Sequence, residues 1–288
     1  MTSSHDQLQR FLFDHTDIRG ELVQLENSYQ DALNNHQYPP SVATLLGEFM
    51  AAVAMLTARL KFEGRLTLQA RSEGQIPLIM AEATSQNTLR GIASQADKAT
   101  SEDFQTLLTN GQLSLIIEPK EGQRYQGIVP LDGNNLAQCL EHYFAQSEQL
   151  STRIWLSAAG GIAAGILLQE LPDTGVCEPS QREISWEHIT TLADTLTAQE
   201  LLSLPFDVLL HRLYHEEPVR VFEPSPLSFK CSCSQDRTLK ALSTLSESEL
   251  NASLLSKAIS ISIASFVISI TSLTGTISPS FSTPPCTR

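Results

Sequence analysis

The chain has 288 residues, with 19 Lys and Arg against 32 Asp and Glu, which gives a formal net charge of −13 at pH 7. Its 41% hydrophobic and 18% charged residues are typical of a soluble globular protein with a sizeable core, in one large domain or two ordinary ones. The acidic balance argues against broad binding to nucleic acid or to an anionic membrane surface, because both need clustered Lys and Arg.

The first residues carry neither the basic nor the apolar region of a secretory signal, so we expect a cytoplasmic protein. Five cysteines are too few for a disulfide scaffold. In a reducing compartment, paired cysteines indicate first a metal site or a redox sensor.

The N-terminal elements are expected in the following order. Leu8, Phe11 and Leu12 predict a short helix, which a strand over 19–25 follows. Pro39 and Pro40 separate this region from the next, and Ser41 is expected to cap a helix. From Val42 to Leu60 the apolar residues recur at spacings of three and four, which predicts a long helix with a wide buried face.

The middle of the chain changes its period. Strands are predicted over 65–70, 112–117 and 125–129, with a hairpin turn at 121–123. Helical spacing returns over 136–149, and two strands follow over 152–157 and 162–171, joined near Gly160 and Gly161. Strands and helices mix without regular βαβ alternation, so the predicted fold class is α+β.

The polar stretch 172–185 is expected to be a loop at a domain boundary. Helices are predicted over 186–215, with a capping box from Thr197 to Glu200 and an interruption at Pro205. Three further prolines then indicate an extended connection towards Cys231. We therefore predict an N-terminal α+β domain (1–178), a helical linker (179–229) and a small C-terminal cysteine region (230–288).

The last 38 residues differ in composition from the rest. No Asp or Glu follows Glu249, and only Lys257 and Arg288 are charged after residue 250. Ser and Thr supply 15 of these residues, and the alternating run 259–263 is prone to β-aggregation. A membrane anchor is the less favoured interpretation, because Ser is too frequent for a typical span.

Cys231 and Cys233 form the sharpest local motif. Two thiols at this spacing can reach one Zn²⁺ ion, but a tetrahedral site needs two more ligands. The spacing alone is a weak signal, and two incidental surface cysteines are an equal alternative. A disulfide within Cys-x-Cys would be strained and reducible, which suits a switch better than a structural link.

Other chemical motifs are weaker. His211 and His215 lie one helical turn apart, but Arg212 stands where a zinc protease has its general-base Glu, and a solvated helix end is the favoured interpretation. Cys139 is expected to be a buried, inert thiol, and Cys177 lies in a polar loop without an obvious partner. Gly160 and Gly161 lack the Lys of a phosphate loop, and no catalytic motif stands out. The local chemistry does not indicate an enzyme.

Several segments together resemble the 33 kDa redox-regulated chaperone family, also called heat-shock protein 33. The matching stretches are Arg-Gly-Glu-Leu-Val at 19–23, Leu-Lys-Phe-Glu-Gly at 60–64, Glu-Gly-Gln-Arg-Tyr-Gln-Gly at 121–127, Tyr-Phe at 143–144, Ser-Glu-Gln-Leu at 147–150, Leu-His-Arg-Leu-Tyr-His-Glu-Glu at 210–217 and Phe-Lys-Cys-Ser-Cys-Ser at 229–234. They occur in the same order over about residues 5–250, and together they are specific.

The resemblance implies an N-terminal α+β domain, a helical linker and a C-terminal domain whose zinc is held by a Cys-x-Cys and a later Cys-x-x-Cys pair. In such proteins oxidants form a disulfide within each pair and expel the zinc, and the linker then unfolds and exposes apolar surface to clients without ATP. Carried over by position, Cys231 and Cys233 are zinc ligands in the reduced state and a redox-switch disulfide in the oxidised state. Family members also form homodimers.

The chain departs from this pattern after Cys233, because no Cys-x-x-Cys follows and only Cys286 remains, an unsuitable substitute. One hypothesis is that the tail is translated in a shifted frame. An allowed codon choice for residues 263–274, read from the third base of the first codon, encodes Cys-Gln-Phe-Cys-Asn-Gln-His-Tyr-Leu-Phe-Asp. As written, the chain lacks two of the four ligands that the family's zinc site needs.

We therefore predict an oxidation-activated, ATP-independent holdase that binds unfolding or oxidatively damaged proteins under heat and oxidative stress, without nucleic-acid or membrane partners. The alternatives are a thiol-dependent redox enzyme, which needs a low-pKa cysteine in a basic niche, and a plain zinc-binding interaction module. Turnover of peroxide or of a disulfide substrate favours the enzyme. Metal binding without redox-dependent client capture favours the module.

Overall fold

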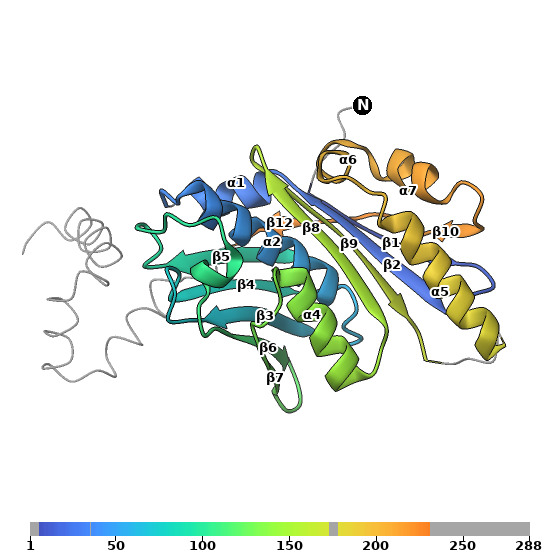
Figure 1. The fold of residues 1–288 in the computed structure, drawn as a ribbon, viewed down its shortest axis with the longest axis horizontal. Helices are drawn as coiled ribbons and strands as arrows, with labels where there is room; N and C mark the ends of the chain where they lie inside the picture. Colours follow the sequence, from blue (N-terminus) through green and yellow to red (C-terminus); the bar gives the residue numbers. More distant parts are fainter. Residues whose placement is uncertain (1–5, 35, 173–177, 231–288) are drawn as a thin grey trace, which may run out of the picture. The chain divides into compact units, whose positions relative to one another are not determined.

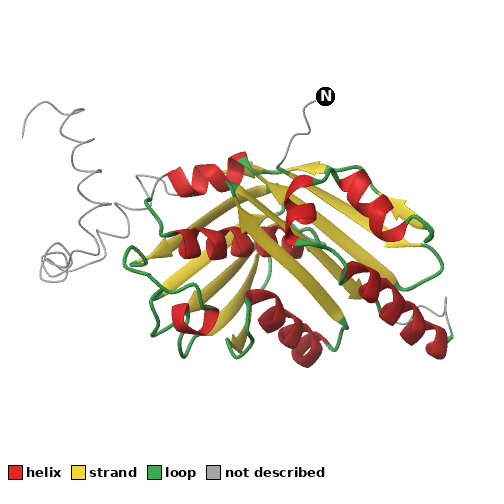
Figure 2. Ribbon diagram, turned by 45° about the horizontal axis from the view of Figure 1, so that its top comes forward, coloured by secondary structure: helices red, strands yellow, loops and turns green. Residues whose placement is uncertain are grey.

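The computed structural model describes residues 6–34, 36–172 and 178–230, and these belong to one compact unit. Two six-stranded sheets form its framework (Figures 1 and 2). We call them sheet A and sheet B. Sheet A has the order β10-β1-β2-β9-β8, and β11 pairs separately with β1; sheet B has the order β12-β5-β4-β3-β6-β7. All neighbouring strands are antiparallel except β12 and β5.

The strands are β1 (Gln7–Phe13), β2 (Ile18–Leu25), β3 (Gly64–Arg71), β4 (Leu78–Thr84), β5 (Thr88–Ser94), β6 (Gln112–Pro119), β7 (Tyr125–Pro130), β8 (Thr152–Ala159), β9 (Ile162–Glu170), β10 (Val219–Val221), β11 (Ser225–Pro226) and β12 (Ser228–Phe229). The helices are α1 (Asn27–Asn34), α2 (Pro40–Thr57), α3 (Phe104–Leu107), α4 (Leu136–Tyr143) with the π-helical turn η1 (Phe144–Glu148), α5 (Pro179–Ala193), α6 (Ala198–Ser203) and α7 (Phe206–Tyr214). This mixed composition confirms the α+β class, whereas the predicted cysteine domain lies outside the described residues.

Helix α2 lies between the two sheets and contacts strands of both. Such a helix must be apolar on nearly all sides, and 13 of its 18 residues are buried. By length and composition it is also the one described helix that could cross a membrane, but 72% of it is buried inside the fold. Its apolar character is therefore explained by its position in the core.

Three local predictions are wrong. Residues 7–13 form β1 rather than a helix, because Leu8 packs towards α2 whereas Phe11 and Phe13 pack on the opposite face of sheet A. With both faces covered, the apolar pattern of a strand loses its simple alternation. Ser41 does not cap α2, which begins at Pro40 after Pro39 without a side-chain cap. Residues 179–185 belong to α5, whose first residue is Pro179, a residue that suits the first helical position.

The other predicted elements in the described residues are confirmed. The strands at 19–25, 65–70, 112–117 and 125–129 are β2, β3, β6 and β7. β6 and β7 pair as the predicted hairpin. The strands predicted over 152–157 and 162–171 are β8 and β9, and Gly160 and Gly161 adopt φ of 61° and 82° in the turn between them, which favours glycine. The division into domains 1–178, 179–229 and 230–288 stays a prediction.

Candidate functional site

The outer face of sheet A, on the side away from α2, is apolar. Its buried residues come from β1, β2 and β9, and they are Phe11, Phe13, Ile18, Leu22, Ala164, Ile166 and Leu168. Gly20 makes the face flat at one point, because a Cβ there would lie 2.0 Å from the Phe11 ring. A face of this kind needs a cover in water, since exposed apolar area costs roughly 25 cal/mol per Å².

The segment 179–229, which we call the linker, supplies that cover. Figure 1 shows α5, α6 and α7 (gold to orange) alongside β1, β2 and β9, and Figure 2 shows these helices lying over the strands. Their buried residues are Ile189, Ala193, Leu201, Leu209, Leu210, Leu213 and Tyr214. The Tyr214 ring meets Phe13 edge-on with centroids 4.8 Å apart. An apolar interface of this type has little directional bonding and separates without breaking a dense polar network.

Few polar contacts fasten the helical part of the linker, α5 to α7, to sheet A. Gln24 of β2 donates from Nε2 to the carbonyl oxygens of Leu201 (2.9 Å) and Leu204 (2.8 Å). Arg153 of β8 donates to Asp194 Oδ1 at 2.8 Å. At the start of the linker, Arg182 pairs with Asp17 and Glu170, and it donates to the carbonyl of Leu171 at 2.8 Å. The capping box between Thr197 and Glu200 is present and sets the start of α6.

The linker ends by rejoining both sheets. Strands β10 and β11 pair with β1, and β12 pairs with β5 of sheet B. The last described backbone contact is the Lys230 amide, which donates to the Leu89 carbonyl at 2.9 Å. Cys231 is the next residue in the sequence. The predicted switch cysteines are therefore joined, through one short strand, to the segment that covers sheet A.

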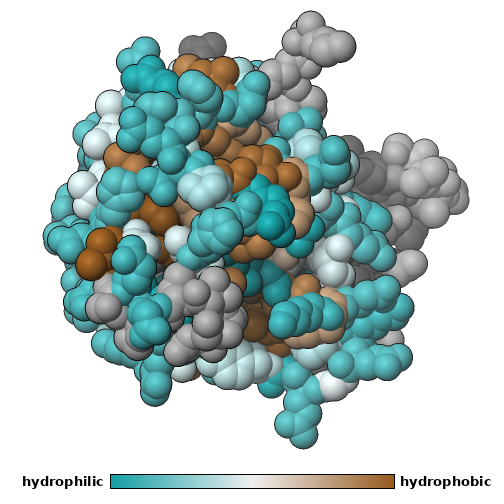
Figure 3. Space-filling model, turned by 90° about the vertical axis from the view of Figure 1, so that its right-hand side faces the viewer, coloured by the Kyte–Doolittle hydropathy of each residue, from teal (hydrophilic) through white to brown (hydrophobic). Residues whose placement is uncertain are grey.

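Surface apolar residues are also concentrated in the linker. Four large hydrophobic side chains of the linker are at least 40% exposed: Ile184 (59%), Val208 (41%), Val221 (51%) and Phe222 (40%). Figure 3 looks onto the side that carries α5, α7 and β10, and apolar surface is visible there among hydrophilic side chains. The linker is thus apolar on its sheet-facing side and in part on its outer side.

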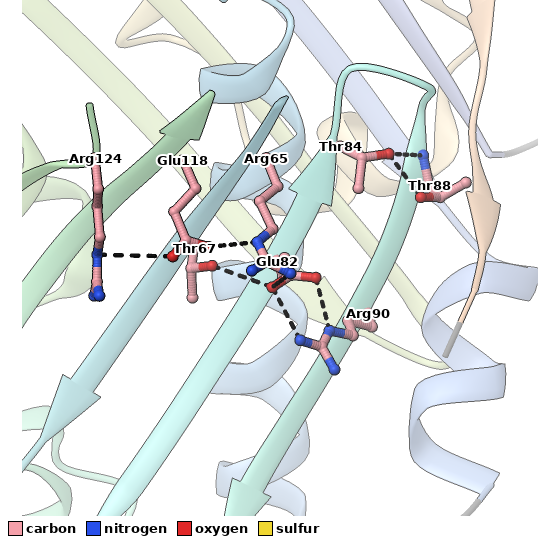
Figure 4. A network of polar contacts seen from close by, with 8 residues as sticks. All are labelled: Arg65, Thr67, Glu82, Thr84, Thr88, Arg90, Glu118 and Arg124. Carbon is pink, nitrogen blue, oxygen red and sulfur yellow. Dashed lines mark hydrogen bonds and ion pairs between the residues drawn. The ribbon is translucent and has the colours of Figure 1, made fainter. Parts of the chain in front are cut away.

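The outer face of sheet B is different in character. Figure 4 shows a charge network that crosses its strands, in which Glu82 accepts two hydrogen bonds of 2.9 Å from Arg90. Glu118 pairs with Arg65 and, at 3.8 Å, with Arg124. Paired charges of alternating sign keep this face hydrated. The outer face of sheet A, by contrast, is built at its centre mainly from apolar side chains.

A buried polar cluster lies on the α2 side of sheet A. Arg19 and Arg59 both donate to Gln169 Oε1, the Arg19 bond being 2.9 Å long. Burial raises the pKa of Glu21, and the nearby Arg59 and Arg19 oppose the shift. Burial also lowers the pKa of Arg59 to about 10, against the pull of Glu21. Both charges are out of water, so each depends on the other.

The predicted site residues are only partly described. Cys231, Cys233, Cys286 and Cys177 lie outside the described residues. Cys139 is a free, buried thiol on α4, and burial raises its pKa, as expected for an inert cysteine. His211 and His215 stack at 5.7 Å on an exposed face of α7. Within the described residues no three His, Cys, Asp or Glu side chains are grouped to hold a metal ion.

The sequence comparisons decide the family. A family model described as Hsp33 protein matches residues 6–262. The chain belongs to the Hsp33 family. Its relatives include the 33 kDa chaperonin of Pseudomonas aeruginosa strain LESB58, which is 55% identical over 249 residues, 86% of this chain and 84% of that protein. The 33 kDa chaperonin of Pseudomonas syringae pv. tomato is 53% identical over 242 residues, 83% of this chain and 81% of that protein.

Among solved structures, the 33 kDa chaperonin (heat shock protein 33 homolog) of Thermotoga maritima matches with a TM-score of 0.71. The match covers 86% of this chain and 88% of that one at 23% sequence identity, which shows the Hsp33 fold. The resemblance inferred from the motifs is confirmed. The family is a chaperone family, which is not an enzyme class, and chaperones bind client proteins.

Sequence reasoning missed several residues that build the site of this Hsp33 family member. Phe11 and Phe13 were hidden in the wrongly predicted helix, and Gln24 gave no signal within a strand. Glu48 had a usable signal, because it is the only charged residue between Pro40 and Thr57 of the apolar helix. Burying a lone carboxylate in such an apolar helix costs free energy unless the carboxylate is paired or hydrogen-bonded, so its presence is a reason to look for a function.

Proposed function

We propose that this chain is an ATP-independent holdase that binds unfolding proteins under heat and oxidative stress, as a homodimer in the cytoplasm. Membership of the Hsp33 family supports the chaperone activity. The observation that carries the proposal is the apolar outer face of sheet A under helices α5 to α7, which few polar contacts hold to the sheet. Release of the linker exposes both apolar surfaces at once, which is the chemistry that captures unfolded chains.

Regulation is proposed to act through the thiols of Cys231 and Cys233. Peroxide oxidises the pair to one disulfide, and the two thiol protons and two electrons reduce the peroxide to two water molecules. Cys231 directly follows Lys230, the last described residue, whose amide donates to Leu89 of sheet B. Because Cys231 closely follows β12, the last strand of the linker, in the sequence, forming the disulfide constrains the end of the linker.

The zinc of the family does not fit the donor set of this chain. Cys231 and Cys233 supply two thiolates, and Cys286 is the one further cysteine in the sequence after residue 230. A closed structural site of the family type needs four ligands. No step of the proposed switch therefore passes through zinc, and we expect sub-stoichiometric metal in the purified chain.

The shifted-frame hypothesis accounts for the missing pair. The family model stops matching at residue 262, one residue before the point where the alternative frame encodes Cys-x-x-Cys. Sequencing codons 245–288 of the gene and measuring the intact mass of the protein test it. If neither shifted frame encodes a Cys-x-x-Cys, the hypothesis is wrong and the tail is genuine.

The test of the chaperone function is light scattering from a heat-unfolding client, without ATP, before and after peroxide at raised temperature. Suppression after peroxide supports the proposal, and a Cys231→Ser, Cys233→Ser double variant should lose the response to peroxide. Suppression before peroxide indicates a chaperone that is active without oxidation, so that its redox regulation is lost. No suppression in either state by a folded protein overturns the proposal.

A further inference from the structure

The edge of β8 that faces away from β9 borders a cavity, and residues from both sides of sheet A line this cavity. Among the described residues β8 is the last strand of this sheet. A cavity of about 220 Å³ runs beside it, lined by Ile154–Ser157 of the strand, by Glu48 and Ala137 on the α2 side, and by Leu196–Ala198 on the linker side. A cavity lined from both sides of a sheet at its edge is open to the backbone of the edge strand.

The backbone of β8 presents hydrogen-bonding groups along this cavity. The Ile154 amide points away from β9 and is already occupied, because it donates to Glu141 Oε1 of α4 at 2.7 Å. In an antiparallel pair the outward-pointing amides recur every second residue, so that of Leu156 faces the cavity and that of Ala158 faces the edge just beyond it. An edge strand with such groups is a template for an added extended segment.

Glu48 gives this edge a charge preference. It lines the β8 cavity together with Asn135, and both residues also line a second cavity of about 490 Å³ that extends to α3. Glu102 and Asp103 line the second cavity, and neither cavity has a Lys or Arg among its lining residues. The described residues give the Glu48 carboxylate no hydrogen bond or ion pair. Its partly buried charge is thus uncompensated within the described fold.

We propose that the β8 edge binds an extended segment of unfolded polypeptide, adding it as a strand and placing a Lys or Arg side chain of the segment against Glu48. Apolar side chains flanking the cation pack on Leu156 and Leu196. The occupant is a client chain, so this inference rests on the proposed holdase function. It names which unfolded segments are preferred, namely extended, apolar ones that carry a positive charge.

The test uses the full chain and a fluorescein-labelled peptide of alternating Val and Thr with one central Lys. Two comparison peptides carry Glu in place of Lys, or N-methyl groups on alternate backbone nitrogens. Fluorescence anisotropy should show binding of the Lys peptide, and binding on the order of tenfold weaker for each comparison peptide. Equal binding of the Lys and Glu peptides, or of the N-methylated one, overturns the proposal.

Two variants with matched controls locate the site. Glu48→Gln should weaken binding of the Lys peptide on the order of tenfold and leave binding of the Glu peptide unchanged. Glu187→Gln, on the exposed side of α5, should change the binding of neither peptide. Ala198→Trp fills the cavity and should abolish binding, whereas Gln199→Trp, the exposed neighbour that does not line it, should not. Circular dichroism of every variant checks the fold.

Client light scattering on the same preparations separates the two proposals. If aggregation is suppressed but Glu48→Gln and Ala198→Trp leave peptide binding unchanged, the proposed docking site is wrong and the holdase function stands. If aggregation is not suppressed in either redox state, the holdase function itself fails.

Discussion

The side-chain amide of Gln24 on β2 lies 2.8 Å from the carbonyl oxygen of Leu204, in the connection between α6 and α7. The same amide also donates to the carbonyl oxygen of Leu201 at 2.9 Å, although Gln24 and Leu201 are 177 positions apart in the sequence. Gln24 is 4% exposed, so this donor lies out of water. One buried donor thus fixes the end of α6 on sheet A, amid an interface that is mainly apolar.

We predict that Gln24→Met loosens the linker. The change keeps the shape of the side chain but leaves the carbonyl oxygens of Leu201 and Leu204 without this donor, which costs about 1–3 kcal/mol. Hydrogen exchange of the α6 and α7 amides should quicken, and client capture without peroxide should rise. The exposed Gln37→Met is the control. Unchanged exchange in α6 would show that Gln24 does not hold the linker.

The stability of the fold should depend on pH through Glu48. Burial raises its pKa to about 7 from an ordinary 4.5. The folded protein then holds a proton that the unfolded chain releases between these values, so stability falls as pH rises from about 4.5 to 7 and stays low above. Titratable neighbours are Tyr29 from α1 and Glu102 and Asp103 before α3, and none supplies a positive charge.

Glu48→Gln removes this pH-dependent cost. Urea unfolding should show a gain of at most about 3 kcal/mol at pH 8, since one pKa unit corresponds to about 1.4 kcal/mol. The gain should shrink towards zero near pH 4.5. A gain that is the same at pH 5 and pH 8 would contradict the predicted desolvation of Glu48.

Arg59 and Glu21 should behave as a coupled pair. Arg59→Met leaves Glu21 buried without the positive charge that opposes its pKa shift most strongly, and should cost about 3–5 kcal/mol near pH 8. The cost should fall as pH is lowered, because the raised pKa of Glu21 allows it to take up a proton. The double variant Glu21→Gln, Arg59→Met should recover part of the loss. If the change in unfolding free energy of the double variant equals the sum of the changes in the two single variants, the two side chains are not coupled.

Thiol labelling should separate Cys139 from the other four cysteines. Its side chain is buried on α4 and its pKa is raised by burial, so little thiolate is present at pH 7. Mass spectrometry after brief iodoacetamide treatment of the native, reduced protein should find Cys139 unmodified. In urea it should react fully. Rapid native labelling at Cys139 would mean that α4 opens readily.

Local patterns were enough for the elements whose partners are near in sequence. The period of α2, the β8–β9 hairpin and the capping box at Thr197 follow from side-chain spacing and turn chemistry within a few residues. Strand β1 was missed because both of its faces are covered, which depends on the linker some 200 positions away. The strands β4 and β5 were not predicted, since Ala81, Ala83 and Gly91 weaken their apolar pattern.

The site was predictable in kind but not in position. The motifs indicated a linker and a thiol switch, and the resemblance indicated capture of clients. Neither showed that the linker lies on sheet A, because that packing joins residues such as Phe13 and Tyr214 across the whole chain. The role of the β8 edge needed the cavity and its lining from both faces of the sheet.

The most direct measurement follows the two tryptophans of the chain during activation. Trp155 on β8 and Trp186 on α5 both pack against the core between linker and sheet A, and Trp155 donates to Asp194 at 3.2 Å. If linker release exposes the capture surface, tryptophan emission should shift to the red after peroxide at raised temperature, in step with suppression of client aggregation. Full suppression with unchanged tryptophan emission would contradict the central claim, because clients would then bind while the linker stays on sheet A.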